Sequence, residues 1–138
     1  MTDWSDLPGT FLTLSPTHRL EMVLEMWIRL QLSRPELRQY THARAEFEWH
    51  GSGCMAVRWL LMVADDQAIK VEKAIDLGPN ATMAVDGMVR PWTEHVDSEQ
   101  ITHGRLTFDF NRASVGLDLF DASNGTLFAH HLVKEVSH

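Results

Sequence analysis

The sequence predicts an α+β fold: an N-terminal helix, or two, followed by a curled antiparallel β-meander of about six or seven strands. Two observations predict it. An apolar stripe at helical spacing precedes Pro35, and after Thr41 the apolar period changes from 3.6 to 2 residues. No repeat or linker interrupts the 138 residues, so one domain, 1–138, is expected. Because antiparallel sheets twist, we expect a cone or partly closed barrel with the helix in its mouth.

The helix is predicted to begin at Ser15-Pro16, since a serine side chain caps free amides and proline suits the first helical position. Pro35 is predicted to end it. Ser33 followed by Glu36 resembles a capping box, which would start a short second helix. The apolar stripe of the main helix consists of Leu20, Val23, Leu24, Trp27 and Leu30.

The next segment predicts a hairpin around the Gly51–Gly53 turn. A three-residue loop places Phe47 opposite Val57 on the apolar face and Glu46 opposite Arg58 on the polar face. A second three-residue loop, 65–67, extends this hairpin to a third strand and opposes Val57 to Ile75. That register leaves one lysine, Lys73, on the apolar face.

Residues 81–96 leave two alternatives open. Asp86-Gly87 is typical of a turn and would join two short strands, whereas Ala81–Val85 would also fit a helical turn. Pro91 excludes a central strand at that point. The polar run Glu94–Gln100 is predicted to be a loop.

The last third of the chain predicts three strands. Residues 111–114 form the first turn, and Asn124-Gly125 is the strongest short hairpin signal because both residues tolerate positive φ. These turns oppose Phe108 to Leu117 and Leu119 to His130. His130 is therefore predicted on the apolar face.

Composition excludes several classes of function. A net charge of −7 is unsuited to nucleic acid. No apolar run is long enough to cross a membrane, and the first residues do not resemble a secretory leader, so a cytoplasmic protein is expected. Cys54 is alone, and the eight histidines show no metal-ligand spacing, so we expect neither a metal nor a cofactor.

The first functional hypothesis is a small acidic binding module that engages a protein partner, as regulators, adaptors, chaperones and immunity proteins do. Its partner would be a protein, in particular a basic one, because the chain is acidic. Trp4 and Trp92 are candidate anchors because neither falls in the predicted core. The polar face of the sheet offers further candidate contacts; these are Glu46, Glu48, Asp118 and His131. A homodimer is compatible with these observations.

The alternative hypothesis is a small pocket enzyme, such as an isomerase, cyclase or dehydratase, that binds a small apolar ligand inside the curled sheet. His130 would act as acid or base and Lys73 as its electrostatic partner. On the opposite face, Asp118 is predicted beside His131, which is half of a catalytic triad. No serine or cysteine is placed beside that pair, so a surface ion pair is favoured there.

Overall fold

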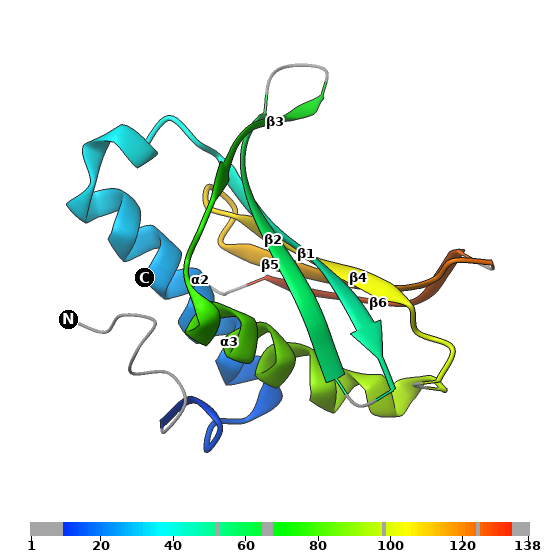
Figure 1. Cartoon of the computed structure of the whole chain (residues 1–138). Coiled ribbons are helices and arrows are strands. Elements are labelled where there is room, and N and C mark those ends of the chain that lie inside the picture. The colour runs from blue at the N-terminus through cyan, green and yellow to red at the C-terminus, as the bar shows by residue number, and fades with distance from the viewer. Residues whose placement is uncertain (1–9, 52, 65–67, 98, 124, 134–138) are drawn as a thin grey trace.

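A computed structural model describes residues 10–51, 53–64, 68–97, 99–123 and 125–133. Among these residues, helices α2 (Pro16–Ser33) and α3 (Pro79–Val89) lie against one face of a six-stranded antiparallel sheet (Figure 1). The α+β class and the N-terminal helix are thus confirmed. In chain order the elements are α2 (Pro16–Ser33), η2 (Pro35–Leu37), β1 (His42–His50), β2 (Gly53–Ala64), β3 (Ile69–Ile75), α3 (Pro79–Val89), η3 (Arg90–His95), β4 (His103–Asp109), β5 (Ser114–Asp121) and β6 (Gly125–Val133).

Helix α2 begins where the sequence predicts. The Ser15 hydroxyl accepts a hydrogen bond from the His18 backbone N–H at 3.3 Å, and proline occupies the first turn. The capping box predicted for a second helix is wrong. Ser33 instead donates its hydroxyl to the Leu30 carbonyl at 3.1 Å, and only the short 3₁₀ helix η2 follows.

The strand order is β3-β2-β1-β4-β5-β6, and each neighbouring pair is antiparallel. Strands β3 and β6 are the two edges of this sheet, so the expectation of a cone or partly closed barrel is wrong. The reason is the path of the chain after β3. It crosses the sheet through α3 and returns to pair β4 with β1, instead of continuing the meander beside β3. Helix α3 then lies on the face that curling would have enclosed (Figure 1).

Residues 79–95 are helical, which confirms the helical alternative for Ala81–Val85 and contradicts the two-strand one. Gly87 is inside α3 rather than in a turn. A Cβ atom there would lie 3.0 Å from Leu12 and 3.1 Å from Phe11, so glycine lets these side chains approach the helix closely. The expected loop at 94–100 begins as the end of η3.

The strand registers are confirmed in one hairpin and shifted in three pairings. Phe47 faces Val57 and Glu46 faces Arg58, as predicted, but the predicted three-residue loop is wrong: Gly53 already pairs with His50, and an irregularity between Glu48 and Trp49 restores the predicted register. Elsewhere Trp59 rather than Val57 faces Ile75, because the pairing begins one residue off, with Val63 opposite Lys70, and a bulge adds a second residue. In the last three strands each pairing slips by two residues: Phe108 faces Val115, and His130 faces Leu117. A slip of two residues keeps every side chain on its predicted face.

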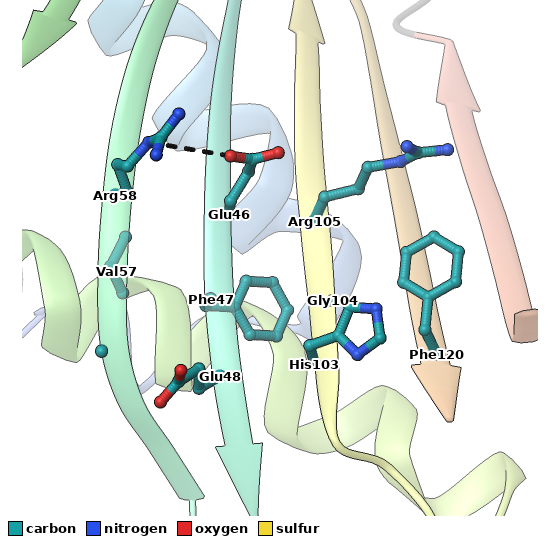
Figure 2. A pocket seen from close by; sticks show the side chains of 10 residues that line it. Glu46, Phe47, Glu48, Val57, Arg58, His103, Gly104, Arg105 and Phe120 are labelled. Carbon is teal, nitrogen blue, oxygen red and sulfur yellow. Dashed lines mark ion pairs between the residues drawn. The ribbon is translucent and has the colours of Figure 1, made fainter. Parts of the chain in front are cut away.

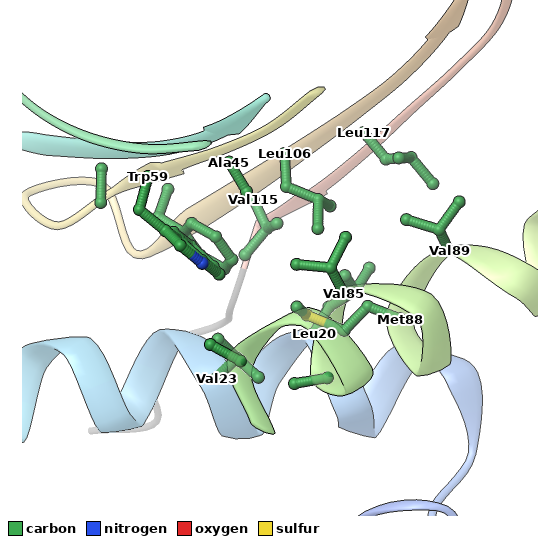
Figure 3. Packing of buried hydrophobic residues seen from close by; sticks show 14 of the residues in the cluster. Leu20, Val23, Ala45, Trp59, Val85, Met88, Val89, Leu106, Val115 and Leu117 are labelled. Atoms are coloured by element: carbon green, nitrogen blue, oxygen red, sulfur yellow. The ribbon is translucent and has the colours of Figure 1, made fainter. Parts of the chain in front are cut away.

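The core lies between the helices and the sheet (Figure 3). At its centre, the ring of Trp27 on α2 packs 5.7 Å from that of Trp59 on β2, which in turn stacks 6.2 Å from Phe108 on β4. Helix α3 adds Val85 and Met88, both fully buried. Burying each such side chain contributes about 1.5–3 kcal/mol, so this layer dominates stability. Within the described residues, no helix has the length and hydropathy needed to cross a membrane.

Candidate functional site

The face of the sheet turned away from α2 and α3, here called the outer face, carries a row of alternating charges. Glu46 on β1 pairs across the strands with Arg58 on β2 and with Arg105 on β4. Arg105 in turn pairs with Asp118 on β5, and Asp118 with Ala129 on β6. One charged residue from each of four neighbouring strands therefore forms the row, and the uncharged Ala129 follows it at the β6 edge.

The two ion pairs of this row differ in strength. Arg105 Nε lies 3.2 Å from Asp118 Oδ2, and both side chains are partly buried. Arg58 Nε lies 3.8 Å from Glu46 Oε1, with 69% and 44% of the two side chains exposed. An exposed pair at that distance contributes at most about 1 kcal/mol. The Glu46 carboxylate can therefore exchange its partner at little cost.

Beside the row lies a groove of about 550 Å³ (Figure 2). Strand β1 contributes both acidic and aromatic side chains to it, and β2, β4 and β5 supply the rest. Glu48 is exposed and forms no ion pair within the described part of the chain. The lining consists of Glu46, Phe47, Glu48, Ala56, Val57, Arg58, His103, Gly104, Arg105 and Phe120.

Gly104 is required for the shape of the groove floor. It faces Phe47 across β1 and β4. A Cβ atom at this position would lie 2.5 Å from Phe47 Cζ and 2.8 Å from the Asp118 carbonyl oxygen, both inside van der Waals contact. Only glycine therefore lets the Phe47 ring extend from β1 toward β4, as Figure 2 shows.

Phe120 forms an aromatic wall on the far side of the groove. The His103 ring stacks on it at 5.1 Å, and the Arg105 guanidinium lies over it at 5.1 Å. His103 is held in this position by Thr102, whose hydroxyl lies 2.8 Å from Nδ1. Carboxylates on one side and π faces on the other are the groups that receive an ammonium or guanidinium.

The structure places the four polar-face residues predicted from sequence on the outer face. Glu46 and Glu48 line the groove, and Asp118 belongs to the charged row. His131 is exposed and pairs with Gly116, so it is not directly opposite Asp118. The predicted Asp118–His131 neighbour pair is wrong because the hairpin slips by two residues, and Arg105 is the partner of Asp118.

His130 and Trp92 meet on the other face, at the margin of the core. Their rings stack at 4.0 Å, and Trp92 is half-buried there. His95 stacks on Phe128 in the same group at 5.3 Å. Burial, with the neighbouring His131 and His95, lowers the pKa of His130. Its Nε2 is buried without a hydrogen-bond partner within the described residues.

Lys73 and His130 are not brought together. Lys73 is exposed on β3 and His130 lies on β6, at opposite edges of the six-stranded sheet. Five interstrand spacings of about 4.8 Å separate the two strands. A site that uses both residues at one ligand is therefore not formed in this chain. Trp4 lies outside the described residues.

Two polar clusters were not predicted from sequence. At the start of β1, His42 Nε2 lies 3.3 Å from Asp109 Oδ2, and its Nδ1 lies 2.7 Å from the Thr41 hydroxyl. That hydroxyl also accepts the Ala64 backbone N–H at 2.8 Å. The arrangement ties β1 to the ends of β2 and β4.

The second cluster surrounds Asp86 on α3. Its carboxylate accepts from Arg90 at 2.8 and 2.9 Å and from the Cys54 backbone N–H at 3.0 Å. Burial and this carboxylate raise the pKa of the Cys54 thiol to about 12. The thiol is therefore protonated at neutral pH and is a poor nucleophile. Within the described ranges, no group of three or more potential metal ligands lies close enough to hold an ion.

No protein-family model, curated protein or solved structure matches the chain.

Proposed function

We propose that this chain is a small cytoplasmic binding module whose outer-face groove receives a basic, extended segment of a partner protein. The observation that carries the proposal is the groove itself. Helices α2 and α3 lie on the other face, while Glu46 and Glu48 line a concave surface that also holds the His103–Phe120 stack. A lysine or arginine of the partner would place its charge between the carboxylates and lay its stem against the aromatic wall.

The energetics of the groove favour such an exchange. Among the described residues, the ion pair of Glu46 is the long, exposed contact with Arg58, and a basic side chain of the partner would replace this weak pair. Glu48 forms no competing pair within the described part of the chain. The net charge of −7 would also accelerate encounter with a basic partner, an effect that salt weakens.

The proposal is tested by titrating isotope-labelled protein with two short extended peptides of the same length, one rich in lysine and one rich in glutamate. We expect the lysine peptide to shift the amide resonances of residues 46–48, 58 and 103–105, and the glutamate peptide to shift none of them. The double variant Glu46→Lys, Glu48→Lys should lose the response while remaining folded.

A matched control separates the groove from overall charge. The double variant Glu94→Lys, Glu99→Lys changes the net charge by the same amount at exposed positions away from the groove. At low salt, we expect its affinity for the lysine peptide to be at most a few-fold lower than that of the wild type. Equal losses in the two double variants would contradict the proposal, because nonspecific attraction to an acidic protein would then account for the binding.

A further inference from the structure

The two edges of the sheet are protected very differently against further pairing. Strand β3 holds the exposed Lys70 and Lys73, and a bulge interrupts its pairing with β2. Charged side chains and bulges are the features that keep an edge strand from adding another strand. Strand β6 has neither proline nor lysine, arginine, aspartate or glutamate over nine residues. Within the described part of the chain, no strand pairs with its outer side.

A second copy of the chain would meet this edge with an identical strand. Ala129 is the middle residue of β6, so an antiparallel twofold pairing about Ala129 uses every residue of the strand. In that register Phe128 faces His130 of the other copy, and Leu127 faces His131. Both pairings keep side chains on the same face, as an antiparallel ladder requires.

The side chains at such a junction are compatible. Phe128 and His130 already belong to the ring group with Trp92 and His95, and pairing them across the junction would extend this stacking into the second copy. Ala129, at the centre, is small and exposed. Two chains of charge −7 repel each other, yet β6 itself brings no formal charge to the contact at neutral pH.

We propose that two copies of this chain associate edge to edge through β6, antiparallel about Ala129, joining their two sheets into one. The inference is independent of the groove, which lies on the outer face and stays open in the pair. It also gives the paired molecule two grooves on one continuous surface.

The register is tested by cross-linking in a Cys54→Ala background, so that each chain carries one thiol. With Ala129→Cys, the two Cα atoms would lie about 4.5–5.5 Å apart, within disulfide range. We expect a disulfide-linked dimer under mild oxidation. With Leu127→Cys alone, the two sulfurs would be displaced by more than about 13 Å along the strands, and no link should form. A mixture of Leu127→Cys and His131→Cys chains should link again.

Association itself is tested by sedimentation equilibrium of the full chain. We expect wild-type mass to rise with concentration from 15.8 kDa toward twice that value. Ala129→Glu would place two carboxylates opposite each other across the junction, beside the two Asp118 side chains. Their repulsion should raise the dissociation constant of the dimer tenfold or more. Mixing Ala129→Glu chains with Ala129→Lys chains should restore association. Ala122→Glu, on an exposed turn, is the matched control and should leave it unchanged.

A wild-type chain that stays at 15.8 kDa up to its solubility limit would overturn the proposal. So would a dimer that Ala129→Glu and Ala122→Glu weaken equally, since the contact would then lie elsewhere. Cross-linking by Leu127→Cys alone, without cross-linking by Ala129→Cys, would also reject the register about Ala129.

Discussion

On the helix-covered face of the sheet, Ala45, Leu106 and Leu117 are fully buried. The residues adjacent to these three along the same strands are Glu46, Arg105 and Asp118, and they point to the outer face. Glu46 forms an exposed ion pair with Arg58, and Arg105 forms a partly buried one with Asp118. The backbone is shared, so the contrast comes from the side chains alone. It indicates that the covered face supplies most of the stability of the fold, while the outer face can be changed at little cost to folding.

The largest expected effect is on the covered face. Phe108→Ala removes a fully buried ring that stacks on Trp59, and should lower the free energy of unfolding by about 3–5 kcal/mol. Phe120→Ala, on the outer face, also removes a phenyl ring, but from a half-buried position. It should lower the free energy of unfolding by less than half as much. Urea unfolding of both variants measures the difference. Equal costs would show that the outer face is as important to stability as the core.

Substituting Gly104 tests how closely the side chains and backbone pack around this position. Gly104→Ala drives a methyl group into Phe47 and the Asp118 carbonyl, and should destabilise by about 1–3 kcal/mol, the usual range for overpacking. Gly116→Ala is the matched control in the neighbouring strand, because its nearest neighbour would be His131 Nδ1 at an ordinary 3.7 Å. Thermal unfolding should show little or no loss for Gly116→Ala. A similar loss in both variants would point to a general cost of alanine in these strands.

The faces of most strands could be predicted from sequence, and most of the pairings could not; in β3 the shifted pairing places Val71 opposite Met62 rather than Leu61, on the other face. Alternation of apolar and polar residues determines which face a side chain occupies, so Phe108 and His130 lie on the face that the alternation predicts. A slip of two residues leaves that alternation unchanged, and only turn geometry prevents it. In the 109–114 turn, Ala113 has φ of +50°, a conformation unusual for alanine that the sequence gives no reason to expect.

The groove was missed for a different reason. It needs β1 beside β4, a pairing between segments separated by two strands and α3. Local periodicity carries no information about which distant strands become neighbours. His103 and Phe120 therefore had no assigned partner, although Glu46 and Glu48 were recognised as outward-facing acids. The Asp86-Gly87 turn signal likewise misled, because Gly87 serves close packing inside a helix.

His130 lies at the boundary of the covered face, and substituting it should have a smaller, pH-dependent effect on the free energy of unfolding. Because its pKa is lowered in the folded chain, the unfolded chain binds the proton more readily, and this residue must cost stability as pH falls below about 6.5. His130→Phe keeps a ring against Trp92 but cannot be protonated. Its stability should fall less steeply than that of the wild type between neutral and mildly acidic pH.

The matched control for this effect is His50→Gln, at an exposed position at the end of β1. It also removes one histidine, but from a position that is exposed in the folded chain. We expect its profile to follow that of the wild type. If His130→Phe also followed the wild type, then burial against Trp92 would not disfavour the charged imidazole.

The smallest expected effect is on the Glu46–Arg58 pair, and it decides whether the outer face is free to bind. A double-mutant cycle with Glu46→Gln and Arg58→Met should give a coupling energy of about 0.2–1 kcal/mol, because the contact is long and both side chains are exposed. The corresponding cycle for Arg105 and Asp118, at 3.2 Å and partly buried, should give a larger value. Salt should reduce the first coupling more than the second. If the Glu46–Arg58 coupling were instead the larger, the Glu46 carboxylate would be committed to the fold, and a basic partner could reach it only by breaking a strong pair.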